Sequence, residues 1–138
     1  MIIMSVDLGK ARTGIAVCDK SESFAFERGV ITEYNEEKLV KKIVEKAREE
    51  KAELIVCGLP KNMDGSFGPR AQECTETAEK IEKSSGIKTV MWDERCTTLS
   101  AAGYLNETDT RGKKRKQIID AVAAVIILED YLAFRKRK

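Results

Sequence analysis

The first 31 residues contain three strand-like stretches with no helical pattern between them, and this feature limits the fold more than any other. Residues 1–8 form an apolar run, broken by Ser5 and Asp7, that stops at Gly9. Residues 13–18 and 24–31 form two more apolar stretches, of which the last is interrupted by charged residues. Short apolar runs bounded by glycine are typical of buried strands. A short glycine-containing link favours a hairpin, so we expect three strands that could be joined by hairpins, with the third at an edge.

Strand and helix patterns alternate through the rest of the chain. Residues 35–51 have acids in the first turn and an apolar stripe at helical spacing. Asn35 is the expected N-cap. Further patterns predict strands at 54–57 and 88–92, a helix from about 69 to 86, a short helix after residue 98 and a last helix over about 117–134. This order predicts an α/β fold with a mixed five-stranded sheet: a three-stranded antiparallel meander, then parallel strands, and helices on both faces. We expect residues 1–138 to form a single domain.

Composition narrows the chemistry. The chain has four cysteines without a C-x-x-C pair and no histidine, so we expect reduced core thiols and no Cys–His nucleophile. The commonest general base near neutral pH is also missing. Any catalysis then depends on carboxylates, lysine, tyrosine or a metal-bound water. No apolar run reaches the roughly 20 residues of a membrane helix and no signal peptide is evident; we expect a cytoplasmic protein that does not bind membranes.

Positive charge is concentrated at the end of the chain. Residues 111–138 carry nine of the 25 Lys and Arg residues but three of the 23 Asp and Glu residues. The basic residues cluster in "RGKKRK" and the terminal "RKRK". Such clusters suit a polyanionic partner. A solvated loop and tail is the alternative interpretation.

Acidic residues fall where a site in an open α/β sheet forms, beyond the carboxyl ends of the strands. Asp7 closes the first strand, Asp93 and Glu94 close the last, and Asp120 lies early in an apolar helix. Each also has a structural alternative: a turn or cap for Asp7, an ion pair with Arg95 for the others, or the helix dipole for Asp120.

Together the acids suggest a metal-dependent site. Carboxylates are hard oxygen ligands that suit Mg²⁺ or Mn²⁺, and two such ions can cleave a phosphodiester without histidine. In that interpretation Gly9 keeps the backbone beside Asp7 unobstructed, and Lys10 and Arg12 neutralise the incoming phosphate. The basic loop just before Asp120, with Lys113, Lys114, Arg115 and Lys116, could clamp the nucleic-acid backbone.

Four blocks of the sequence resemble one family in order and spacing. "SVDLGKARTGIAVCD", "IVCGLPKNMDGSFGPRAQ", "VMWDERCTT" and "KKRKQIIDAVAAVIIL" are similar to the YqgF/RuvX family of Holliday-junction resolvases and pre-16S rRNA processing nucleases. The resemblance covers nearly the whole chain and implies a ribonuclease-H-like fold and a two-metal nuclease that hydrolyses structured nucleic acid. It implies catalytic roles for Asp7, the Asp93/Glu94 pair and Asp120, with Glu94 favoured over Asp93 as the metal ligand. It further implies that Arg12, Asn62, Gly65, Arg70 and Arg95 line the substrate groove.

Two other functions remain open at this stage. The chain could be a nucleic-acid-binding module in ribosome maturation or transcription, without catalysis. Because the first block also resembles the phosphate loop of actin-like ATPases, it could instead be a nucleotide-binding half-site. Those proteins need two such domains around the nucleotide, and 138 residues supply one. Nucleotide binding would therefore require a homodimer. The sequence does not distinguish RNA from DNA as the substrate.

Overall fold

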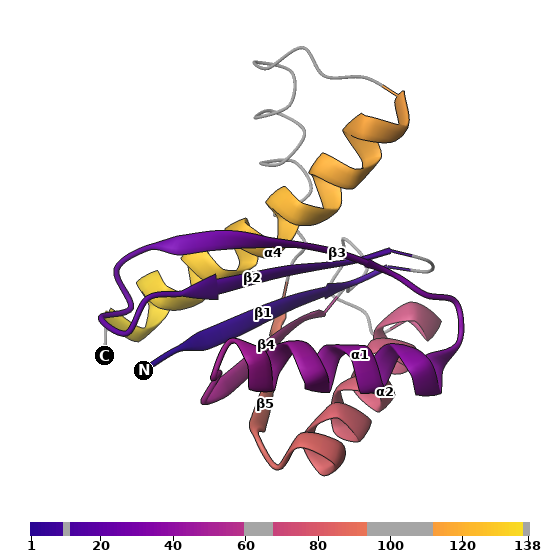
Figure 1. The fold of residues 1–138 in the computed structure, drawn as a ribbon, viewed down its shortest axis with the longest axis horizontal. Helices are drawn as coiled ribbons and strands as arrows, with labels where there is room; N and C mark the ends of the chain where they lie inside the picture. The colour runs from indigo at the N-terminus through magenta and orange to yellow at the C-terminus, as the bar shows by residue number, and fades with distance from the viewer. Residues whose placement is uncertain (10–11, 60–67, 94–111, 137–138) are drawn as a thin grey trace.

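The computed structural model describes residues 1–9, 12–59, 68–93 and 112–136. Its five strands form one mixed sheet in the order β3-β2-β1-β4-β5 (Figure 1). The strands are β1 (Ile3–Leu8), β2 (Arg12–Cys18), β3 (Ala25–Thr32), β4 (Leu54–Leu59) and β5 (Lys88–Asp93). The β1–β2 and β2–β3 pairs are antiparallel, whereas β1–β4 and β4–β5 are parallel. The predicted meander followed by parallel strands is therefore confirmed.

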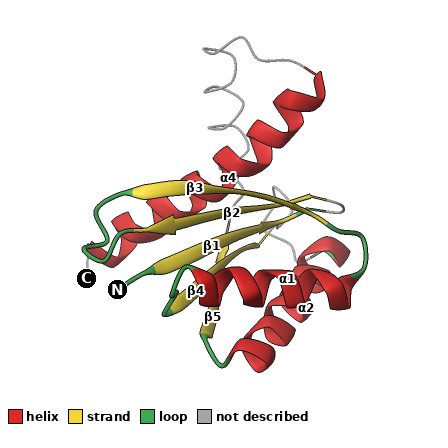
Figure 2. Ribbon diagram, viewed as in Figure 1, coloured by secondary structure: helices red, strands yellow, loops and turns green. Residues whose placement is uncertain are grey.

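Helices cover both faces of the sheet, as the sequence predicts (Figure 2). Helices α1 (Glu36–Glu49) and α2 (Pro69–Ser85) pack on one face, and α4 (Gly112–Lys136) packs on the other. The predicted short helix after residue 98 lies outside the described residues. Among the described residues, no helix is long and apolar enough to cross a membrane.

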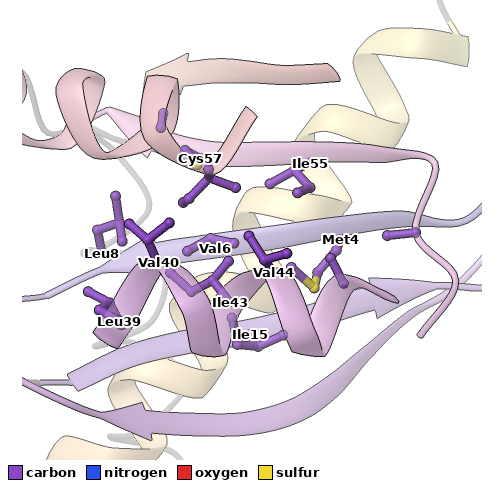
Figure 3. Close-up of a cluster of buried hydrophobic side chains, with 14 of the residues drawn as sticks. Met4, Val6, Leu8, Ile15, Leu39, Val40, Ile43, Val44, Ile55 and Cys57 are labelled. Atoms are coloured by element: carbon purple, nitrogen blue, oxygen red, sulfur yellow. The ribbon is translucent and has the colours of Figure 1, made fainter. Parts of the chain in front are cut away.

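The face under α1 and α2 holds the larger core cluster. Asn35 caps α1, accepting a hydrogen bond from the Lys38 amide at 3.0 Å. The apolar stripe of α1 then packs on side chains of β1, β2 and β4 (Figure 3). The stripe is the predicted one: Leu39, Val40, Ile43, Val44 and Ala47. Gly86 ends α2 in the left-handed conformation, φ 73°, that favours glycine.

Successive residues of β1 point to opposite faces. Met4, Val6 and Leu8 belong to the core under α1 and α2. Ile3 packs in the α4 cluster, and the Ser5 hydroxyl bonds to α4. The alternation puts Asp7, the next residue in the series 3, 5, 7, on the α4 face.

Helix α4 differs from the prediction at its start. The sequence predicts a helix from about Gln117 because the basic run before it has no apolar residue. The structure begins the helix at Gly112, so the four basic residues form its first turns. Lys and Arg are good helix formers, and these turns extend past the sheet (Figure 1), where no apolar stripe is required.

The direction of α4 is antiparallel to that of β1. Near the end of α4, Arg135 Nε donates to Glu22 Oε1 at 2.6 Å. Glu22 follows β2, which runs back toward the start of β1. The last turn of α4 therefore lies near the N-terminus (Figure 1), and its earlier turns lie toward the carboxyl end of β1.

Candidate functional site

Asp7 lies at the carboxyl end of β1, in the middle of the sheet. It is half-buried and pairs with Gly14 of the antiparallel strand β2. β1 is flanked by β2 and β4; Asp7 itself is paired on the β2 side, and it directly follows Val6, the last residue of β1 registered with β4. A carboxylate here is rigidly mounted, as a ligand or catalytic group needs to be.

One buried hydrogen bond sets the position of α4 relative to β1. The Ser5 hydroxyl, fully buried, donates to the carbonyl of Ala124 at 2.6 Å. Asp7 lies two residues beyond Ser5, about 7 Å along the strand. Asp120 lies one helical turn before Ala124, about 6 Å along the helix. Since the two elements are antiparallel, both displacements point the same way, and the backbones of Asp7 and Asp120 come to the same end of the sheet.

Ser5 is the residue of this site that the sequence prediction missed. Its signal was visible: a lone hydroxyl in an otherwise apolar strand needs a partner when it is buried.

Asp93 is the last residue of β5, at the same end of the sheet as Asp7. It pairs with Leu59 of β4, two residues past the level at which β4 pairs with Val6. Two strand spacings, about 10 Å, separate β5 from β1. The backbones of Asp93 and Asp7 therefore lie at the same end of the sheet, where the parallel strands have their carboxyl ends, but two strands apart. Glu94, the other member of the pair, lies outside the described residues.

The predicted nucleic-acid contacts divide into described and undescribed residues. Lys10, Asn62 and Arg95 lie outside the described residues. Arg12 begins β2 and is half-buried beside β3. Lys113, Lys114, Arg115 and Lys116 lie in the first turns of α4, before Asp120 on the same helix.

Arg70 lies in the first turn of α2, and its guanidinium turns toward the protein. Its Nη2 donates to the Leu8 carbonyl at 2.6 Å, and its Nη1 lies 3.0 Å from Glu73 Oε2. The bond to Leu8 attaches the start of α2 to the end of β1, one residue past Asp7.

The structure explains why residue 9 is a glycine, and this explanation was not part of the sequence interpretation. A Cβ added to Gly9 would lie 2.2 Å from the carbonyl oxygen of Arg12. Glycine is therefore needed for the close approach between the end of β1 and the start of β2. This contact explains Gly9 without any ligand.

A cleft of ≈ 450 Å³ opens beside the end of β1 on the α1/α2 side. Its carboxylates are all in ion pairs. Those pairs are Glu33 with Lys42, Glu36 with Lys80, and Glu73 with Arg70. The hydrogen bond from Lys42, helped by the Asn35 amide, lowers the pKa of Glu33. Leu8 and Gly9 line the cleft but Asp7 does not, so the cleft and the Asp7 side chain lie on opposite faces of the sheet.

The predicted metal site includes residues outside those that the structure describes. Within them, no group of three or more His, Cys, Asp and Glu side chains could hold a metal ion. The predicted ligand set includes Glu94 and the side chain of Asp120, which are not described. The predicted donors are all carboxylates, and this donor chemistry fits Mg²⁺ or Mn²⁺. Three of the cysteines, Cys18, Cys57 and Cys74, are buried in the core, as predicted.

Comparison with known proteins identifies the family of this chain. The family model described as "RuvX: Holliday junction resolvase" matches residues 1–134. A Halothermothrix orenii protein named "Putative pre-16S rRNA nuclease" is 39% identical over 140 residues, covering 99% of this chain and 98% of its own. The chain belongs to the RuvX family. The RuvX family is the one that the four sequence blocks resemble, so that prediction is confirmed.

Solved structures confirm the ribonuclease-H-like fold expected of a RuvX member. Thermus thermophilus RuvC in complex with a Holliday junction substrate has a TM-score of 0.64 at 11% identity, over 100% of this chain and 97% of its own. The fowlpox virus resolvase in complex with Holliday junction DNA has a TM-score of 0.62 at 10% identity, over 98% and 99%. At these identities the similarity concerns the fold alone.

Proposed function

We propose that this RuvX-family protein is a divalent-metal-dependent endonuclease that hydrolyses phosphodiester bonds in structured nucleic acid. The substrates we propose are the 5′ region of pre-16S rRNA and the four-way DNA junction, after the names of its relatives and of its family. The observation that carries the proposal is the antiparallel packing of α4 on β1 through the Ser5–Ala124 bond. That packing brings two acidic positions, 113 residues apart in the chain, to one end of the sheet.

We assign the metal ligands to Asp7, Glu94 and Asp120, with Asp93 as the alternative to Glu94. Trp92 packs edge-on against Tyr131 of α4 at 5.5 Å. Neighbouring side chains of a strand point to opposite faces, so we expect only one of the two acids to be the ligand, and we favour Glu94. When bound, Mg²⁺ or Mn²⁺ would activate a water and stabilise the leaving oxygen. The protein's part is to hold the carboxylates on rigid elements, with their charge directed to one place.

We assign substrate binding to the basic residues around this end of the sheet. Arg12 starts β2 one hairpin away from Asp7, and the four basic residues of α4 precede Asp120 by one to two turns. Lys10, Asn62 and Arg95 complete the proposed set. Contacts of this kind bind phosphates rather than bases, so they predict affinity that falls steeply with salt.

The test is cleavage of a pre-16S rRNA fragment and a four-way junction, each with Mn²⁺ or with EDTA. We expect Mn²⁺-dependent cleavage that is lost in Asp7→Asn and Asp120→Asn. Asp130→Asn is the matched control, because Asp130 is exposed and lies ten residues further along the same helix. Cleavage at the wild-type rate in either site variant would refute the assignment. Binding without turnover in any metal would instead favour the non-catalytic binding module.

The basic residues have a separate test. Replacing Lys113, Lys114, Arg115 and Lys116 by glutamine should weaken binding of both nucleic acids and flatten the salt dependence of the binding constant. Glutamine is itself a good helix former, so α4 should keep its start. An unchanged salt slope would exclude these residues from the interface.

A further inference from the structure

Arg70 joins the start of α2 to the carboxyl end of β1 by a side-chain hydrogen bond. Its bond to the Leu8 carbonyl is short, at 2.6 Å, and joins residues 62 positions apart. A charged donor makes such a bond stronger than one between neutral groups. The Arg70 side chain is 35% exposed, so it forms this bond at the surface rather than in the core.

The Leu8 carbonyl lies beyond the part of β1 that pairs with β4. Among the described residues, β1 pairs with β4 only as far as Val6. Leu8 pairs with Thr13 of β2, but on the β4 side it lies two residues past the last paired position. Arg70 supplies a hydrogen bond to the strand at this point.

This support bears on Asp7 through the backbone. The peptide bonds are rigid, so only the backbone torsions of residues 7 and 8 separate the Asp7 Cα from the Leu8 carbonyl. Fixing that carbonyl restricts the direction in which the Asp7 carboxylate leaves the strand.

We propose that Arg70 is a positioning residue, which holds Asp7 in the orientation needed for metal binding by clamping the Leu8 carbonyl. This role differs from the place in the substrate groove that the family resemblance implies for Arg70. It rests on the proposed function, since it assumes that Asp7 binds a divalent cation.

The two roles of Arg70 separate in two binding measurements. Mn²⁺ affinity is measured by titration calorimetry, and four-way-junction affinity is measured in EDTA, with no metal present. For Arg70→Met the positioning role predicts about tenfold weaker Mn²⁺ binding, the lower end of the effect of groups that orient a ligand. It predicts unchanged metal-free junction binding. Arg70→Lys, which keeps a donor, should restore much of the Mn²⁺ affinity.

Two control variants test whether the effect is specific. Arg48→Met removes another arginine that donates to a backbone carbonyl, that of Ser84 at 3.4 Å, near the C-terminal ends of α1 and α2. Glu73→Gln removes the other partner of Arg70 but leaves its bond to Leu8. Both should keep wild-type Mn²⁺ affinity. Melting temperatures of all variants show whether each is folded.

The outcomes distinguish the two proposals. If the wild type binds no Mn²⁺, the proposed function fails, and the positioning role fails with it. If the wild type binds Mn²⁺, and Arg70→Met and Arg70→Lys are folded and bind it with the affinity of the wild type, only the positioning role is overturned. Loss of metal-free junction binding with unchanged Mn²⁺ affinity would also overturn it, and would make Arg70 a substrate contact.

Discussion

Replacing Ser5 by alanine tests the bond that sets the position of α4 on the sheet. Ser5 is 0% exposed, and its hydroxyl donates to the Ala124 carbonyl at 2.6 Å. A buried hydrogen bond of this kind contributes about 0.5–1.5 kcal/mol net. The Ala124 carbonyl lies within α4 and can keep its helical hydrogen bond, so no full penalty for an unpaired group is added. We expect Ser5→Ala to lower the free energy of unfolding by about 1 kcal/mol.

Urea denaturation measures this change, and the midpoint should fall without a change in slope. For a chain of this size, about 1 kcal/mol corresponds to a fall in melting temperature of roughly 3–5 °C. Thr77→Val is the matched control: the Thr77 hydroxyl is also buried, but it bonds to the Glu73 carbonyl of its own helix at 3.0 Å, a local bond that adds little stability. Equal stability changes in the two variants would refute the reasoning, because the bond between α4 and β1 would then contribute no more than a bond within one helix.

Three further predictions concern the hairpins and the end of α4. Gly9→Ala should destabilise the protein by about 1–3 kcal/mol, because its Cβ would overlap the Arg12 carbonyl; wild-type stability in urea would show that this approach is not needed. Hydrogen bonds from Ser21 and the following turn lower the pKa of Asp19 to about 2. The stability that the ionised Asp19 carboxylate adds to the folded protein should be fully present above about pH 4 and be lost as the pH falls through about 2. A titration of the Asp19 carboxyl by NMR with a midpoint near 4 would contradict this. The hydrogen bond from Arg135 lowers the pKa of Glu22, so the destabilisation by Glu22→Gln at neutral pH should shrink in acid; a melting-temperature difference that does not depend on pH would argue against the pair.

The sheet could be predicted because its local patterns agree with the tertiary structure. The first apolar run is buried from Ile3 to Val6 and at Leu8, and the run at 13–18 and the stripe of α1 are buried as predicted. The start of α4 could not be predicted, because a basic run without apolar residues has the same pattern as a loop. The structure begins α4 at Gly112, just before this basic run, and Lys and Arg are good helix formers.

The positions of Asp7 and Asp93 at strand ends could be predicted. The expected place of Asp120 near a helix start is wrong, because α4 begins at Gly112 and Asp120 lies further inside it. The relation of these acids in space could not be predicted. That relation depends on the direction of α4 across the sheet and on the Ser5–Ala124 contact, between residues 119 positions apart. Arg70 shows the same limit. Its place in a family motif implies a position in the substrate groove, whereas its bond to the Leu8 carbonyl appears only in the folded chain.

The proposed convergence of Asp7 and Asp120 on one divalent-metal site is tested most directly by X-ray diffraction from crystals grown with Mn²⁺, recorded for anomalous scattering. We predict an anomalous peak within coordination distance, about 2–2.5 Å, of carboxylate oxygens from both Asp7 and Asp120. A well-ordered structure in which the two carboxylates face different sides of the sheet, or in which manganese binds elsewhere and leaves both without metal, would contradict the account.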